Sequence, residues 1–105
     1  APRKAAVLGS MLELGAESAA WHRRVGALAA AAGLDLVIFV GEYAGDYVQG
    51  ASSVKGGPRV FGVEDHGSAA ACLRRHCRAG DVILLKGSRG ARMEAVLDSL
   101  VEEVG

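Results

Sequence analysis

The chain has 105 residues, with 12 basic and 12 acidic side chains and a hydrophobic fraction of 50%. A chain of this length forms one domain whose single core needs no disulfide or metal. The charge balance disfavours a nucleic-acid partner, whose phosphates select a basic face. The longest apolar run is too short to span a bilayer. We therefore expect a cytoplasmic protein with neither nucleic acid nor membrane as a partner.

Four apolar runs, each followed by a helical pattern, organise the chain. In chain order the predicted strands are Lys4–Leu8, Leu36–Val40, Arg59–Val63 and Asp81–Lys86. The predicted helices are Ser18–Ala32, Tyr43–Ala51, Ser68–Arg78 and Arg92–Val104, with a surface loop at Ser52–Pro58. In the first helix Trp21, Val25, Leu28, Ala29 and Ala32 recur at helical spacing. This stripe predicts that Trp21 and Leu28 are buried against the sheet.

The alternation of strands and helices predicts an α/β fold: a three-layer, Rossmann-like parallel sheet with helices on both faces. Continuous apolar strands such as Leu36–Val40 are typical of strands covered on both faces. Right-handed crossovers then favour four strands in the order 3-2-1-4, with a switch point between the first and fourth. Ligands of such sheets bind at the carboxyl ends of the strands, at the switch point. Any site should therefore lie between the loops Gly9–Gly15 and Gly87–Gly90.

The loop after the fourth strand has the composition of an anion site. It opens a predicted helix, whose free N–H groups and dipole favour a negative charge. Lys86 and Arg89 add positive charge and Ser88 adds a donor. A solvated glycine turn is the alternative, and the residues alone do not decide between the two. No phosphate-cradling GxxxxGK[ST] loop occurs in the chain, so we assign no catalytic residue.

The remaining candidates are weaker. Cys72 and Cys77 are five residues apart on a predicted helix and point about 140° apart, so we expect Cys77 to pack in the core without a disulfide. The three histidines lack metal-ligand spacing, and we expect no metal. His22 reads as a surface histidine and Glu13 as a solvated or helix-capping carboxylate.

Two acidic residues raise the possibility of a regulatory domain. Glu64 and Asp65 follow the third strand and could pair with Lys86, as in a phosphoryl-accepting receiver domain. Such a domain requires an acidic residue directly after its first strand, where this chain has Ser10.

Two separate motifs carry a resemblance to a known family. The stretch AVLGSMLELGAES precedes WHRRVGALAAAAGLD, and KGSRGARME follows the fourth strand. Together they resemble the Mur ligase family, in the branch that adds D-alanyl-D-alanine, which shows an LGDMxELG loop, a histidine with Val-Gly on the next helix, and a KGSRxxxME segment. The matching residues are Leu8, Gly9, Met11, Glu13, Leu14, Gly15, His22, Val25, Gly26, Val40, Gly41, Lys86, Gly87, Ser88, Arg89, Met93 and Glu94. The match covers nearly the whole chain, and Ser10 stands where the family carries aspartate.

The resemblance implies that residues 1–105 form the C-terminal, substrate-presenting domain of an ATP-dependent ligase. The whole enzyme would add D-Ala-D-Ala to UDP-N-acetylmuramoyl-tripeptide in peptidoglycan synthesis. ATP and magnesium would be bound mainly by a central ATPase domain, which this chain would close over. We expect these residues to contain neither that domain nor the N-terminal UDP-sugar domain, and the 105-residue chain to be inactive and free of cofactor on its own.

The resemblance also assigns site residues. The dipeptide would be bound by Lys86, Gly87, Ser88 and Arg89. The residues facing the substrate or the central domain would be Gly9, Ser10, Met11, Glu13, Gly15 and His22. The alternative is an independent receiver-like or anion-binding regulatory module that uses the same switch point.

Overall fold

A computed structural model describes residues 3–10, 15–78 and 80–86. The elements in chain order are β1 (Lys4–Gly9), a short 3-10 helix η1 (Gly15–Glu17), α1 (Ser18–Ala30), β2 (Leu36–Val40), α2 (Ala44–Ala51), β3 (Arg59–Val63), α3 (His66–His76) and β4 (Val82–Lys86). The helix predicted at Arg92–Val104 lies outside the described residues.

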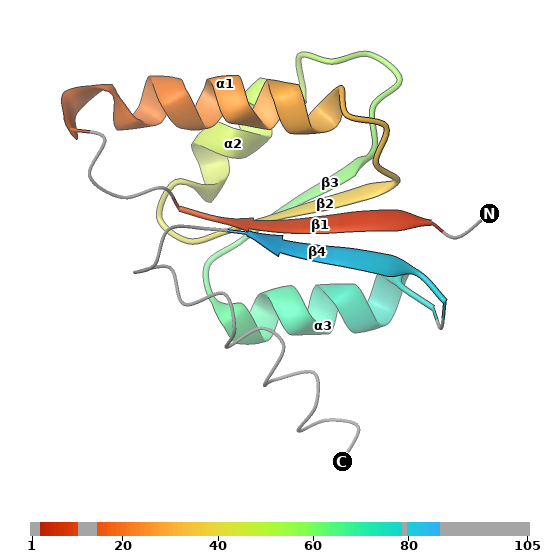
Figure 1. The fold of residues 1–105 in the computed structure, drawn as a ribbon. Coiled ribbons are helices and arrows are strands. Elements are labelled where there is room, and N and C mark those ends of the chain that lie inside the picture. The colour runs from red at the N-terminus through yellow and green to blue at the C-terminus, as the bar shows by residue number, and fades with distance from the viewer. Residues whose placement is uncertain (1–2, 11–14, 79, 87–105) are drawn as a thin grey trace.

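The four strands form one parallel sheet in the order β3-β2-β1-β4. Ala5 pairs with Leu36 on one side of β1, and Leu8 pairs with Lys86 on the other. Helices α1 and α2 cover one face of the sheet and α3 covers the other (Figure 1). The predicted fold, strand order and switch point between β1 and β4 are therefore confirmed.

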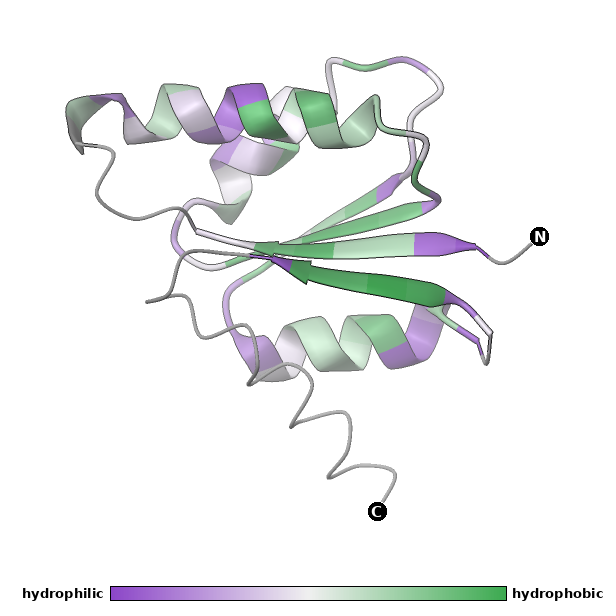
Figure 2. Ribbon diagram, in the orientation of Figure 1, coloured by the Kyte–Doolittle hydropathy of each residue, from purple (hydrophilic) through white to green (hydrophobic). Residues whose placement is uncertain are grey.

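The core has two halves because the central strands are buried on both faces. Val7, Ile38 and Leu73 belong to the half beneath α3, whereas Phe39 and Tyr47 belong to the half beneath α1 and α2. All five residues of β2 are buried, and Figure 2 shows the strands as predominantly hydrophobic. Burial on both faces is the reason that these strands read as unbroken apolar runs.

Cys77 packs against the half of the core beneath α3, as predicted, although α3 ends one residue earlier at His76. Cys72 packs there too, and both cysteines are free thiols. Among the described helices, none is both long enough and apolar enough to cross a membrane.

The expected burial of Trp21 and Leu28 against the sheet is wrong, because Trp21 is 41% exposed and Leu28 is 64% exposed. Two other members of the predicted stripe do face the core: Ala29 is buried there and Val25 packs against it. The buried residues of α1 also include Gly26. A Cβ at Gly26 would collide with the backbone carbonyl of Tyr47, and one at Gly50 would collide with the carbonyl of Arg23. The backbones of α1 and α2 are thus in contact, which only a small-residue face permits.

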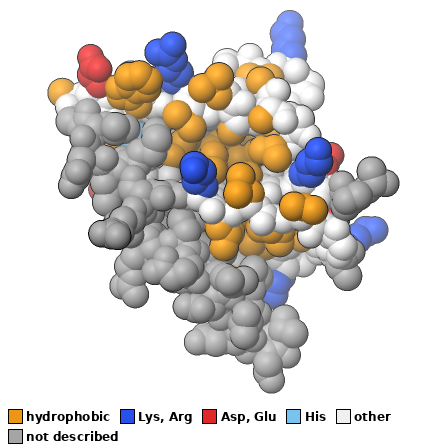
Figure 3. All heavy atoms as spheres, in the orientation of Figure 1, with side chains coloured by type: hydrophobic (Ala, Val, Ile, Leu, Met, Phe, Trp, Pro, Cys, Tyr) orange, Lys and Arg blue, Asp and Glu red, His pale blue; other side chains and the backbone are white. Residues whose placement is uncertain are grey.

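The large exposed apolar side chains of the described residues lie on α1 and on the edge strand β4. Val82 and Leu84 of the edge strand β4 are more than half exposed, in addition to Trp21 and Leu28. Figure 3 shows hydrophobic side chains spread over the face that carries α1, β1 and β4.

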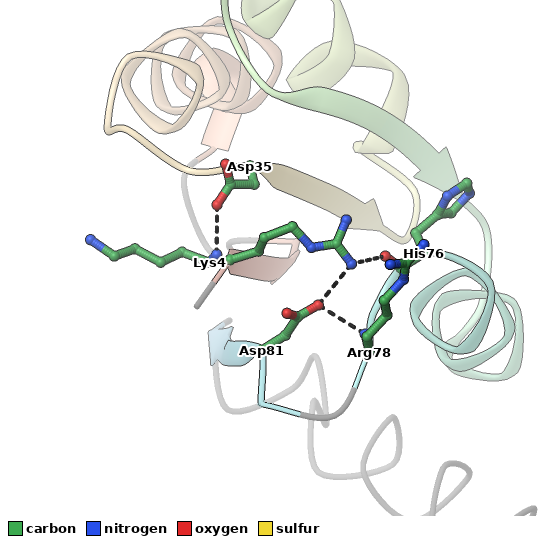
Figure 4. Close-up of polar contacts among 6 residues, drawn as sticks. Lys4, Asp35, His76, Arg78 and Asp81 are labelled. Carbon is green, nitrogen blue, oxygen red and sulfur yellow. Dashed lines mark hydrogen bonds and ion pairs between the residues drawn. The ribbon is translucent and has the colours of Figure 1, made fainter. Parts of the chain in front are cut away.

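The amino ends of the strands are joined by polar contacts (Figure 4). Arg3 Nη2 donates to the carbonyl of His76 at 2.8 Å and to Asp81 Oδ2 at 3.0 Å. Asp81 Oδ2 also accepts from the Arg78 N–H at 2.9 Å. The Arg78 N–H, with a smaller contribution from Arg3, lowers the pKa of Asp81. These bonds connect the start of β1 to the end of α3 and the turn before β4.

Candidate functional site

The carboxyl ends of β1 and β4 lie side by side, as the predicted switch point requires. β1 ends at Gly9 and β4 ends at Lys86, and the pairing of Leu8 with Lys86 sets their relative height. Both strands run toward the same edge of the sheet, at the left of Figure 1. Lys86 is exposed there. The structure therefore brings together Gly9, Ser10 and Lys86 among the predicted site residues.

Other predicted site residues are placed elsewhere or are not described. Gly15 begins the short helix η1 that leads into α1. Met11, Glu13, Gly87, Ser88 and Arg89 lie outside the described residues. Their assignment to the substrate and to the interdomain loop stays a prediction.

Tyr47 of α2 holds the carboxyl end of β1 in place. The Tyr47 hydroxyl donates a hydrogen bond of 2.7 Å to the carbonyl of Gly9. The side chain is 1% exposed, and burial raises the pKa of Tyr47 to about 12. The hydroxyl therefore stays protonated at physiological pH and remains a donor. Its ring stacks on Phe39 of β2 at a centroid distance of 4.5 Å.

The expectation that His22 is a surface residue is wrong, because its side chain is fully buried. Its Nδ1 lies 2.6 Å from the carbonyl oxygen of Ser18, and since a carbonyl only accepts, Nδ1 carries a proton. The ring stacks on Tyr43 at 4.2 Å and meets Tyr47 edge-on at 4.8 Å. His22 and Gly26 thus share the face of α1 that packs on α2.

Sequence reasoning missed this aromatic cluster. Tyr43 and Tyr47 are four residues apart, a spacing that brings two side chains to one side of a helix, and both rings contact His22. The spacing was the available signal. Nothing local in the sequence indicates that α1 supplies the third ring.

Ser10 follows the end of β1 and packs against the exit of β2. It is 9% exposed, and its Oγ has no hydrogen-bond partner in the part of the chain that the structure describes. A Cβ added at Gly41 would lie 2.7 Å from that oxygen, and Gly41 also has φ +111°, a conformation that favours glycine. Glycine at position 41 therefore lets the two strand exits approach each other.

An open groove of about 720 Å³ lies beside these exits. Gly41 and Glu42, which follow β2, border it on one side, and Gly62 of β3 with the following Glu64 borders it on the other. The described residues contain no group of three or more His, Cys, Asp or Glu side chains arranged to hold a metal ion.

The suggested pairing of Glu64 and Asp65 with Lys86 is wrong. β3 and β4 occupy opposite edges of the sheet, roughly 14 Å apart at the usual strand spacing of about 4.8 Å. Asp65 instead caps α3, with Oδ1 accepting from the Ser68 N–H at 2.7 Å.

The strand order and the helices on both faces define a Rossmann-like α/β domain. Residues 1–89 match the family model described as "Mur ligase, glutamate ligase domain". The chain belongs to the Mur ligase family.

Curated relatives share one name, UDP-N-acetylmuramoyl-tripeptide–D-alanyl-D-alanine ligase. The protein of Mycobacterium tuberculosis strain H37Rv is 36% identical over 96% of this chain and 22% of its own length. The Escherichia coli K12 protein is 40% identical over 91% of this chain and 20% of its own length. The chain thus spans about a fifth of the length of these relatives.

Solved structures agree with this assignment. MurF from Acinetobacter baumannii superposes with a TM-score of 0.82 at 28% identity, over 97% of this chain and 23% of that one. The MurF ligase of Thermotoga maritima in complex with ADP gives a TM-score of 0.72 at 30% identity, over 99% and 23%. None of these relatives supports an independent regulatory module.

Proposed function

We propose that this chain is the C-terminal, substrate-presenting domain of an ATP-dependent ligase that joins D-Ala-D-Ala to UDP-N-acetylmuramoyl-tripeptide. The observation that supports it is the match of almost the entire chain to a UDP-N-acetylmuramoyl-tripeptide–D-alanyl-D-alanine ligase, at 36% identity over 96% of its residues. The fold places the chain's polar strand ends at the edge where sheets of this kind bind ligands. The work of such a domain is to hold and orient the incoming dipeptide.

The proposed reaction places three requirements on a substrate-presenting domain. ATP would transfer its γ-phosphoryl group to the tripeptide carboxylate, which releases ADP and gives an acyl phosphate. The dipeptide amine would then attack the acyl carbon, which forms the amide bond and releases inorganic phosphate. The domain must bind the dipeptide, aim its amine, and exclude water that would hydrolyse the acyl phosphate. We assign the dipeptide carboxylate to the segment beginning at Lys86, because an ammonium group and a loop rich in N–H groups suit an anion.

ATP and magnesium belong to another part of the longer enzyme in this proposal. At the switch-point edge the described residues offer the ammonium of Lys86 and the unpartnered hydroxyl of Ser10. They bring no metal-binding cluster together. An ammonium and a hydroxyl suit contact with one anionic group of a ligand. A UDP-linked substrate and ATP also place the enzyme in the cytoplasm.

The test uses the full-length protein that carries this domain. Phosphate release is measured with ATP, magnesium and UDP-N-acetylmuramoyl-tripeptide, with and without D-Ala-D-Ala. We expect release that depends on the dipeptide and is matched by formation of the pentapeptide product. The 105-residue chain should give no release above background. A full-length protein that forms no such product would overturn the proposal.

A further inference from the structure

The unpartnered hydroxyl of Ser10 requires an explanation. Buried polar groups are almost always hydrogen-bonded, because an unpaired one loses its water without compensation. Ser10 is 9% exposed and its Oγ has no partner, whereas the buried hydroxyl of Tyr47 and the part-buried hydroxyl of Ser53 are both bonded to carbonyls. Such an exception calls for a specific explanation, and a functional role is one of the recognised ones.

Three neighbouring features describe the surroundings of Ser10. Its predecessor Gly9 is held by the hydrogen bond from Tyr47. Gly41, with no side chain, leaves its Cβ position open directly beside the Ser10 oxygen. On the neighbouring strand β4, Lys86 pairs with Leu8. Leu8 lies two residues before Ser10 in the chain. A neutral donor and an exposed ammonium therefore stand at adjacent strand ends.

We propose that the Ser10 hydroxyl is a ligand-binding group that donates a hydrogen bond to an oxyanion whose charge is balanced by Lys86. The inference rests on the proposed function for the identity of the ligand. The oxyanion belongs either to the carboxylate of the dipeptide or to a phosphate of the nucleotide, which share this chemistry. The free protein leaves the hydroxyl unpaired, and ligand binding satisfies it.

This role predicts opposite effects on stability and on binding. Ser10→Ala removes a buried group that has no partner, so the melting temperature of the 105-residue chain should rise by about 2–5 °C. The same change in the full-length ligase should weaken the binding of one ligand roughly tenfold. Ser53→Ala is the matched control, because the Ser53 hydroxyl is already bonded to the Gly50 carbonyl at 2.7 Å. It should not raise the melting temperature and should leave both affinities unchanged.

Ligand binding is measured by calorimetry on the full-length ligase, wild type and Ser10→Ala, in the presence of UDP-N-acetylmuramoyl-tripeptide. The dissociation constants are determined for D-Ala-D-Ala and for a non-hydrolysable ATP analogue. If only the affinity for the dipeptide falls, the oxyanion that Ser10 binds is the dipeptide carboxylate. If only the affinity for the nucleotide falls, the oxyanion is a phosphate. Unchanged affinity for both ligands, or a lower melting temperature of Ser10→Ala, overturns the inference.

The two proposals fail in different ways. A wild-type enzyme that is active while Ser10→Ala binds both ligands normally overturns only the role of Ser10. A wild-type protein that binds both ligands but forms no pentapeptide overturns the proposed function while leaving the binding comparison valid. A wild-type protein that binds neither ligand overturns both.

Discussion

Tyr47 and Gly9 are joined by a 2.7 Å hydrogen bond that connects α2 to the last residue of β1. The two residues are 38 positions apart, and the bond is buried. Since Ser10 comes next in the chain, this contact sets where the candidate ligand-facing loop begins. A residue that contacts no ligand can therefore control the geometry of the site.

Replacement of Tyr47 by Phe should destabilise the fold by about 1 kcal/mol, because it removes one buried hydrogen bond and leaves the ring stacked on Phe39. Urea denaturation followed by circular dichroism measures the change. The control is Tyr43→Phe on the preceding turn, whose hydroxyl makes no hydrogen bond to the described residues, and it should be close to neutral. In the full-length ligase Tyr47→Phe should also alter the apparent KM for D-Ala-D-Ala. Equal stability of the two variants would contradict the importance of the bond.

Alkaline pH should destabilise the wild type through the same residue. Burial raises the pKa of Tyr47 from 10.0 to about 12 in the folded chain. Between these values the unfolded chain has lost more protons than the folded one, so stability falls as pH rises from about 10 to about 12. The urea concentration at the unfolding midpoint, measured at pH 9, 10 and 11, should fall less with rising pH in Tyr47→Phe than in the wild type. Parallel declines would argue against burial of this hydroxyl.

The crossing of α1 and α2 gives the largest expected loss of stability. Gly26→Ala places a Cβ against the backbone of Tyr47, and because backbone cannot move aside cheaply, we expect a loss of about 3 kcal/mol or failure to fold. Gly45→Ala is the matched control in the first turn of α2, where nothing lies within 4 Å of the new Cβ. It should be neutral or should stabilise by up to about 1 kcal/mol. Similar effects at the two positions would show that the helices are not in contact.

Acid should destabilise the chain in two stages. Partial burial, and then the neighbouring Arg59, lowers the pKa of His76 below its ordinary 6.5. Backbone N–H groups lower the pKa values of Asp65 and Asp81 below 3.8. In each case the unfolded chain binds more protons, so stability is present above the ordinary pKa and falls as pH drops below it. In His76→Gln the free energy of unfolding should decline less between pH 7 and 5 than in the wild type, and it should still decline below pH 4. An unchanged profile for this variant would remove His76 from the explanation.

The exposed apolar face should make the 105-residue chain self-associate. Leu28 and Leu84 are each more than half exposed on this face, and large exposed apolar patches promote association. Sedimentation velocity should show a weight-average mass that rises with concentration. Leu28→Gln with Leu84→Gln should reduce the rise, whereas Ser52→Gln with Lys55→Gln, on the loop after α2, should not. A monomer at all concentrations would contradict the prediction.

The sheet could be predicted from the sequence because burial on both faces leaves a direct signal. Leu36–Val40 is apolar at every position, and the structure begins and ends β2 at those residues. The orientation of α1 could not be predicted in the same way. The predicted stripe includes Trp21 and Leu28, which are exposed. The helix instead turns Gly26 toward the backbone of Tyr47 in α2, and no local pattern in α1 indicates this long-range contact.

The candidate site was predictable in its location and less so in its contacts. The strand order alone directs Gly9 and Lys86 to one edge. The hydrogen bond from Tyr47 and the ring contacts of His22 join segments far apart in the chain, and no local pattern encodes them.

The contact between α1 and α2 also bears on how the domain opens. Because Gly26 and Gly50 bring the two backbones together, neither helix can leave the sheet while the other stays in place. Their amides should therefore exchange with deuterium at similar rates, as one cooperative unit. Among the described helices, α3 is the one that covers the opposite face, so its amides should exchange independently and earlier (Figure 1). The strand exits that carry Gly9 and Gly41 would then belong to the slowest-opening part of the molecule.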